Sequence, residues 1–97
     1  MKNYINTHIN ANMQKGFQTY VGSLYFYEDG LEYKAKAVNA DIAFGKILYS
    51  NIISVANTNT LGIVPNGIKL ITHDGKEYKF VVSNRKNVIK FISSKIE

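Results

Sequence analysis

The sequence contains no cysteine, which excludes several kinds of site at once. Disulfide bonds, zinc sites built on cysteine and thiol redox chemistry all require that residue. A protein that needs no disulfide bonds can fold in a reducing compartment. We therefore expect a cytoplasmic protein.

Long apolar runs are also missing. Crossing a bilayer as a helix takes about 20 apolar residues, and no run here approaches that length. The first residues, Met1 to Tyr4, lead into polar asparagine and threonine rather than into the apolar block of a signal peptide. Lys2 stands where myristoylation needs glycine, and prenylation needs a cysteine. Any contact with a membrane is predicted to be peripheral.

The 97 residues predict one domain, residues 1–97, with a formal charge of +5. The basic excess lies in residues 49–97, which hold seven lysine or arginine residues against three acids. One interpretation is a surface that faces anions. The other is ordinary lysines that keep the protein soluble. The candidate anion-facing residues are Lys76, Lys79, Arg85, Lys86 and Lys90.

Two Asp-Gly pairs, Asp29-Gly30 and Asp74-Gly75, each join two runs of alternating apolar residues, which is the pattern of a β-hairpin. In the first hairpin, a four-residue loop over 27–30 puts Leu24, Phe26, Leu31 and Tyr33 on one face, and Gly30 is expected at positive φ. In the second hairpin, a three-residue turn over 73–75 that ends in a glycine bulge places the apolar residues of both strands on one face of the sheet. That face is made of Ile68, Leu70, Tyr78, Phe80 and Val82.

The remaining strands are predicted from weaker signals. Alternation over 7–17 indicates a first strand that bends at Gly16. A polar linker over 38–41 precedes a short strand through Phe44, Lys46 and Leu48, and a further strand is expected over 53–58. The strand after Pro65 is predicted to begin at Gly67.

The segment 57–66 is the oddest part of the sequence, because it has the composition of a long loop and yet carries three aliphatic residues. Exposed loops are seldom so apolar. We expect this loop either to fold back on the domain or to make a contact with a membrane, another protein or a second copy. The candidate contact residues are Leu61, Gly62, Ile63, Val64 and Pro65.

The end of the chain has the periodicity of an amphipathic helix. Ser83 or Asn84 can cap a helix that runs to about Ile96. Its apolar stripe consists of Val88, Phe91, Ile92 and Ile96, and its opposite face carries Arg85, Lys86 and Lys90. Such a stripe can close one end of a curled sheet.

The order of these predicted strands and of the C-terminal helix resembles that of a GRAM domain of the small bacterial type. This family belongs to the pleckstrin-homology-like superfold. Five segments carry the resemblance: Gly22–Phe26, Gly30–Lys34, Ile47–Ile52, Gly67–Leu70 and Asp74–Phe80. The resemblance spans residues 21–96. It implies a mainly β fold, a bent antiparallel barrel of about seven strands capped by one C-terminal helix. Larger members of the family use the module to contact lipid or protein, but the resemblance does not itself imply a ligand.

Catalytic and metal-binding patterns are not found in the sequence. His8 and His73 are the only histidines, and neither stands in a metal-ligand motif. The acidic pair Glu28-Asp29 lies in a predicted turn, where aspartate serves backbone hydrogen bonding. A nucleophile elbow and a glycine-rich phosphate loop are also missing. We therefore expect a protein that is not an enzyme and needs no cofactor or metal.

Three kinds of partner remain open. Contact with another protein, or self-association, is the first prediction. Peripheral binding to anionic lipid, through the basic helix face and the loop 61–64, is the second. Tyr25 and Tyr27 are predicted to project near Lys34 and Lys36, an arrangement that can stack nucleic-acid bases. It can equally stabilise neighbouring strands. Nucleic acid is the least favoured partner, because the sequence has no concentrated basic stripe.

Overall fold

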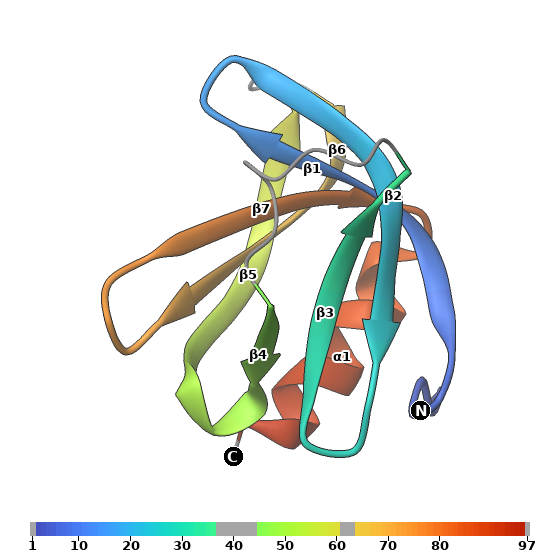
Figure 1. The fold of residues 1–97 in the computed structure, drawn as a ribbon, viewed down its shortest axis with the longest axis vertical. Helices are drawn as coiled ribbons and strands as arrows, with labels where there is room; N and C mark the ends of the chain where they lie inside the picture. Colours follow the sequence, from blue (N-terminus) through green and yellow to red (C-terminus); the bar gives the residue numbers. More distant parts are fainter. Residues whose placement is uncertain (1, 37–44, 61–63, 97) are drawn as a thin grey trace.

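The computed structural model describes residues 2–36, 45–60 and 64–96. These residues form one curled antiparallel sheet and a single α-helix that packs against it (Figure 1). The sheet has seven strands in the order β4-β3-β2-β1-β7-β6-β5. The elements are β1 (His8–Lys15), β2 (Gln18–Phe26), β3 (Gly30–Ala35), β4 (Lys46–Leu48), the 3-10 turn η2 (Tyr49–Asn51), β5 (Ile52–Thr60), β6 (Val64–Thr72), β7 (Glu77–Val82) and α1 (Arg85–Lys95). The predicted fold class, a mainly β curled sheet with one C-terminal helix, is confirmed.

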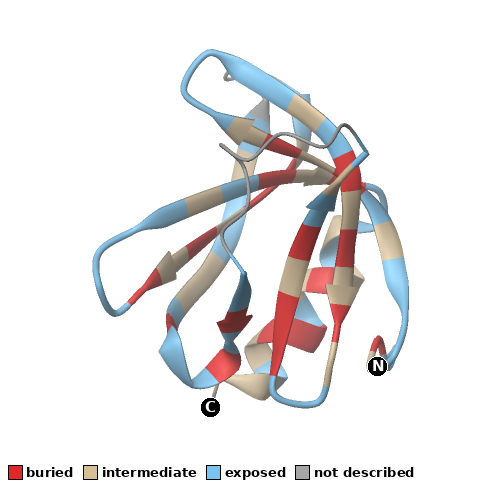
Figure 2. Ribbon diagram, in the orientation of Figure 1, coloured by how far each residue is buried: buried red, intermediate tan, exposed pale blue. Residues whose placement is uncertain are grey.

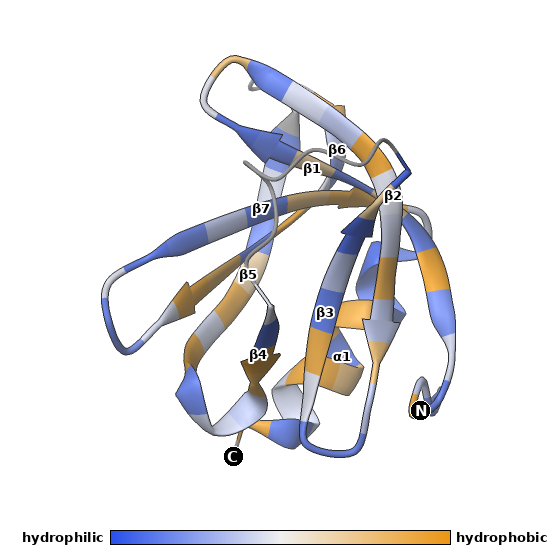
Figure 3. Cartoon of the chain, in the orientation of Figure 1, coloured by the Kyte–Doolittle hydropathy of each residue, from blue (hydrophilic) through white to orange (hydrophobic). Residues whose placement is uncertain are grey.

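The first hairpin has the predicted register. Phe26 pairs with Leu31, so the connecting loop is the four residues 27–30. The predicted inner face of β2 and β3 is buried, and the charged residues of β3 alternate with it (Figures 2 and 3). The expectation that Gly30 has positive φ is wrong. Glycine is required there because an added Cβ would lie 2.4 Å from the carbonyl oxygen of Ile47 in the neighbouring strand β4.

The second hairpin also has the predicted turn. The backbone N–H of Thr72 donates to the carbonyl of Lys76 at 3.0 Å, and Gly75 donates to Thr72 at 2.9 Å. Gly75 has φ of 82°, as a glycine bulge after a type I turn requires. Leu70 pairs with Tyr78 and Ile68 pairs with Phe80, so the predicted apolar face is formed.

The segment 57–66 differs from its prediction as a long loop. Strand β5 continues to Thr60 and strand β6 already begins at Val64, so most of this segment belongs to a β-hairpin. The predicted start of β6 at Gly67 is wrong for the same reason. Asn, Gly and Pro are weak strand formers, but pairing with a neighbour outweighs a local propensity of this size. The candidate contact residues 61–63 and the predicted linker 38–41, with Phe44, lie outside the described residues.

Strand β1 lies at the centre of the sheet and joins its two halves. It pairs with β2 along its whole length and with β7 over residues 11–14. Gly16, with φ of 61°, makes the predicted bend into β2. Because β1 connects the two hairpins, the sheet curls around the inner apolar residues and leaves β4 and β5 as its two edges.

The helix α1 closes the concave side of the sheet with the predicted stripe. Val88, Phe91 and Ile92 are buried, and Ile96 is partly buried against the same cluster. The predicted side-chain cap is not formed. Asn84 occupies the cap position with φ of 57°, and its backbone carbonyl accepts hydrogen bonds from Asn87 and Val88.

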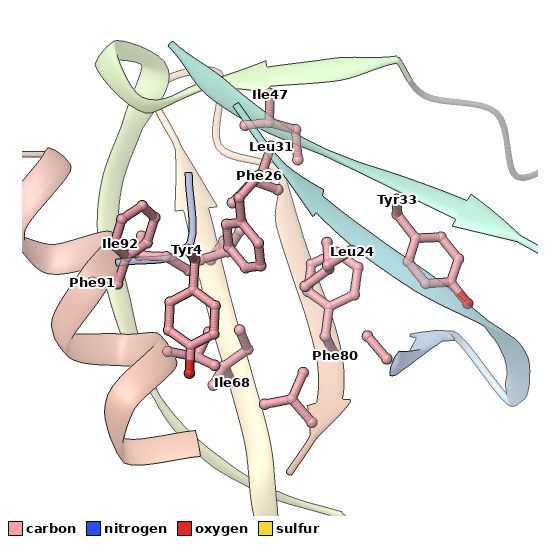
Figure 4. Packing of buried hydrophobic residues seen from close by; sticks show 14 of the residues in the cluster. Tyr4, Leu24, Phe26, Leu31, Tyr33, Ile47, Ile68, Phe80, Phe91 and Ile92 are labelled. Atoms are coloured by element: carbon pink, nitrogen blue, oxygen red, sulfur yellow. The ribbon is translucent and has the colours of Figure 1, made fainter. Parts of the chain in front are cut away.

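The N-terminal segment contributes a core residue that the sequence analysis did not predict. Tyr4 is 2% exposed, and its ring lies 5.3 Å from that of Phe26 and 5.5 Å from that of Phe91 (Figure 4). The residues before β1 therefore bridge the helix and the first hairpin. This contact joins the helix to the first hairpin, and the helix also lies against β5 and β6.

Candidate interaction surfaces

The structure does not bring the five candidate anion-facing residues onto one surface. Lys79 is exposed on β7, where it alternates with the fully buried Phe80 and so projects from the convex face of the sheet. Lys86 and Lys90 are exposed on α1, which covers the concave face. Lys76 follows the β6–β7 turn, 4.0 Å from the carboxylate of Asp74. These lysines are therefore divided between opposite sides of the molecule.

Arg85 occupies a different environment from these lysines. Its side chain is half-buried, and its Nη1 donates to the backbone carbonyls of Thr58 at 3.0 Å and Gly67 at 3.4 Å. These hydrogen bonds tie the start of α1 to β5 and β6. Within the described part of the chain, four ion pairs join lysines to acids, and none includes Arg85.

The acids in the two hairpin loops are engaged by their own neighbours. Both carboxylate oxygens of Asp29 accept from Lys46 Nζ, at 2.8 and 2.9 Å, and this hydrogen bond lowers the pKa of Asp29. Asp74 accepts a hydrogen bond from the Thr72 hydroxyl, which lowers the pKa of Asp74, and a further one from the Lys76 N–H. Both aspartates therefore have a structural role in holding a loop.

The outward tyrosines are covered by neighbouring side chains. The ring of Tyr25 stacks on His8 at 4.9 Å and lies 4.7 Å from Lys34 Nζ. The Tyr27 hydroxyl donates to Glu32 at 3.2 Å. These contacts agree with the interpretation that the outward tyrosines stabilise neighbouring strands. Binding of nucleic acid at this face stays an untested prediction.

The buried tyrosines also serve the fold. Burial, together with the negative charge of Asp29, raises the pKa of Tyr49 to about 12. The Tyr49 hydroxyl donates to the carbonyl of Tyr27 at 2.9 Å, which ties η2 to the first hairpin. Burial also raises the pKa of Tyr4 and Tyr33. Among the described residues, no three His, Asp or Glu side chains come together as metal ligands would.

Phe17 is the most exposed large apolar residue of the described chain. It stands with Gly16 at the tip of the β1–β2 hairpin, and Lys15 precedes the turn. A hollow of about 310 Å³ beside this tip is lined by Gln14, Lys15, Gly16, Glu77 and Lys79. The tip therefore combines a fully exposed aromatic ring with lysine. Within residues 2–36, 45–60 and 64–96, no helix has the length and apolar character needed to cross a membrane.

The two edges of the sheet differ in length and in charge. Strand β4 has three residues, one of which is Lys46. Strand β5 has nine residues and contains neither a charged residue nor proline. Natural edge strands are usually protected from pairing by short length, lysine, proline or bulges. Strand β4 has two of these protections. Among the described residues, β5 has register shifts near its two ends, and α1 lies against it.

The register identifies which backbone groups of β5 face the open edge. Thr72 is hydrogen-bonded to Lys76 in the β6–β7 hairpin. Hydrogen-bonded and non-hydrogen-bonded pairs alternate, so Leu70 and Ile68 also bond towards β7, and Lys69 and Gly67 bond towards β5. Their partners in β5 are Ala56 and Thr58. The N–H and C=O groups of the alternate residues, Val55 and Asn57, therefore point to the open side of the sheet.

No family model matches the sequence. No curated protein matches it either. The structure is similar to the crystal structure of the C-terminal domain of an unknown protein from Leishmania infantum, with a TM-score of 0.79. The two chains are 16% identical, and the match covers 95% of this chain and 83% of the other. At this level of identity, the similarity supports the fold alone.

Proposed function

We propose that this chain is a non-catalytic interaction module of the pleckstrin-homology-like, GRAM type, and that its partner is another protein. The observation that carries the proposal is the open edge of β5. In this uncharged strand, the backbone N–H and C=O groups of Val55 and Asn57 face the open side. A cytoplasmic location is part of the same proposal.

Recognition at such an edge follows a general mode. An extended segment of a partner adds to the sheet as a further strand, and main-chain hydrogen bonds hold it. The side chains of that segment then alternate between the two faces of the sheet. The seven-stranded sheet and the C-terminal helix agree with what the GRAM resemblance implies, which supports the assignment to an interaction module.

Asn57→Pro is expected to abolish protein binding, because proline removes the outward N–H of residue 57 and places its ring at the open edge. Edge strands accept proline where the N–H faces solvent. Asn57→Ala keeps the N–H and is the matched control. We would immobilise the three proteins and compare, by quantitative mass spectrometry, what each retains from a lysate of the source cells. Retention of the same proteins in the same amounts by all three would contradict binding through β5.

Peripheral binding to anionic membrane is a second candidate, and the exposed ring of Phe17 favours it. An aromatic residue at a hairpin tip can enter the interface between headgroups and acyl chains, while nearby lysine meets anionic lipid. The tip of β1–β2 adds an apolar element to this candidate beside the loop 61–64, of which residues 61–63 lie outside the described residues.

Phe17→Ser is expected to lower the fraction of protein that sediments with vesicles of phosphatidylcholine and phosphatidylserine. Binding should also weaken with added salt, because charges are screened over about 8 Å at physiological ionic strength. Thr19→Ser, at another exposed position of the same hairpin, is the control. Equal sedimentation with pure phosphatidylcholine, or none with either vesicle, would remove this candidate.

A further inference from the structure

We infer that Asn66 is a site of spontaneous deamidation, and that Arg85 sets the rate of this modification by holding the end of the β5–β6 hairpin closed. Asn66 is the only asparagine of the chain that is followed by glycine. Glycine has no side chain to shield its backbone nitrogen, and its backbone rotates more freely than that of other residues. The nitrogen of Gly67 can therefore reach the Asn66 side chain when this part of the strand opens.

The reaction consumes only water, and it involves no oxidation or reduction. The backbone nitrogen of Gly67 attacks Cγ of Asn66 and loses its proton, while the side-chain amide leaves as ammonia. The product is a five-membered succinimide. Water then opens this ring at one of its two carbonyl carbons and leaves aspartate or isoaspartate at position 66. Asparagine is one of the thermolabile residues because its side chain can react in this way.

The fold requires the glycine of this reactive pair. A Cβ atom at position 67 would lie 2.7 Å from Cγ2 of Thr58 and 2.9 Å from the Thr58 carbonyl oxygen. Thr58 is the residue that pairs with Gly67 across the hairpin. The two strands can approach this closely only because residue 67 has no side chain. Asn66 is therefore joined to the residue that favours its deamidation.

The closed hairpin blocks the attack. The alternation of the ladder directs the N–H of Gly67 towards β5, where the Thr58 carbonyl accepts it. Gly67 is buried, and Asn66 is half-buried. Closure of the succinimide ring also requires the backbone between Asn66 and Gly67 to rotate out of the extended conformation of a strand. Deamidation therefore proceeds from a state in which this hydrogen bond is broken.

Arg85 reinforces the same pair from the start of α1. Its Nη1 lies 3.0 Å from the carbonyl oxygen of Thr58 and 3.4 Å from that of Gly67, so one cation spans both residues of the pair. The register of β5 and β6 shifts between Thr58 and Thr60, so the regular pairing ends next to this pair. Local opening begins where regular hydrogen bonding ends. Arg85 thus holds the point that has to open.

Deamidation would change both the charge and the backbone of β6. Either product adds a carboxylate and lowers the formal net charge of +5 by one. Asn66 lines a hollow of about 390 Å³ together with Asn10, Asn12 and Ser83, so the new charge would lie beside these uncharged side chains. Isoaspartate also lengthens the main chain by one methylene group. This product should displace Gly67 from its pairing position and weaken the attachment of α1.

Incubation of the folded protein at neutral pH, followed by peptide mass spectrometry, measures the rate of deamidation at Asn66. Arg85→Met removes the guanidinium and keeps an unbranched side chain. We expect it to raise this rate at least about tenfold, because hydrogen bonds from a charged group are lost. Lys86→Met removes the same charge at the exposed next residue and should leave the rate unchanged. In urea all three proteins should react at one rate, since the hairpin is then unfolded.

Hydrogen exchange of the Gly67 amide gives a second measurement that needs no variant. The folded parent should deamidate more slowly than an unstructured peptide of residues 64–70. The protection of the Gly67 N–H from exchange should equal this slowing, because both reactions require the same hydrogen bond to open. This comparison also decides the matter if Arg85→Met does not fold.

A further variant separates local opening from unfolding of the whole domain. Phe91→Leu lowers the stability of the core without removing a contact of Arg85, so it should not change the rate. An increase as large as that of Arg85→Met would place the reaction in the globally unfolded state and overturn the inference. Equal rates for the parent and Arg85→Met, or an equal increase for Lys86→Met, would overturn the role of Arg85. Absence of deamidation at Asn66 in urea would overturn the site itself.

Discussion

Replacing Phe91 by alanine is expected to lower the free energy of unfolding by about 3 to 5 kcal/mol, the range measured for buried aromatic residues. Phe91 is 2% exposed, and its ring lies 5.5 Å from Tyr4, 5.6 Å from Phe26 and 6.2 Å from Tyr49. It therefore joins the helix to the N-terminal segment, to β2 and to η2. Unfolding in urea, followed by circular dichroism, measures the loss.

The control for this substitution is Lys90→Ala on the exposed side of the same helix, which should change the free energy of unfolding by less than about 0.5 kcal/mol. Phe91→Leu keeps part of the apolar volume and gives a measurable value if the alanine variant does not fold. Equal effects of Phe91→Ala and Lys90→Ala would show that the helix is not docked on the sheet.

The two hairpins could be predicted from the sequence because their signals are local. Asp74-Gly75 indicates the turn, and the alternation on both sides leaves one register that unites the apolar residues. In the first hairpin, the same reasoning found the loop length but gave the wrong reason for Gly30. Its need for glycine comes from the close approach of β4, which lies about 17 residues further along the chain.

The end of β5 and the start of β6 could not be predicted in this way. The segment 57–66 contains residues typical of loops, and only its pairing across the sheet makes it strand. The candidate surface depends on long-range structure even more strongly. A strand over 53–58 was predicted, but its place at the edge follows from the pairing of β1 with β7.

Arg85 illustrates the same limit for single residues. The helical pattern places it on the polar side, together with Lys86 and Lys90. The structure turns its side chain towards Thr58 and Gly67, two residues of another hairpin. A helical wheel describes one helix alone, so it contains no information on which strand a boundary residue will meet.

Tyr4 is the clearest case of a core residue without a sequence signal. It precedes the first strand, belongs to no periodic pattern and is followed by a turn at Asn6, which has φ of 64°. Its burial depends on both Phe26 and Phe91, which come from distant elements. Hydrophobic periodicity could not identify it, because periodicity requires a regular element.

Replacing Tyr4 by alanine is therefore expected to cost about 2 to 4 kcal/mol, although the residue lies in an irregular segment near the start of the chain. Tyr25→Ala is the control, since this tyrosine lies on the outer face, and its loss should stay below about 1 kcal/mol. The double variant of Tyr4 and Phe91 should show a coupling of about 0.5 to 1.5 kcal/mol, because the two rings meet edge to face. If urea unfolding gives the same small loss for Tyr4→Ala as for Tyr25→Ala, the N-terminal segment does not hold the helix. Loss of stability without coupling would mean that Tyr4 acts through Phe26 alone, because Phe26 is its other ring contact at 5.3 Å.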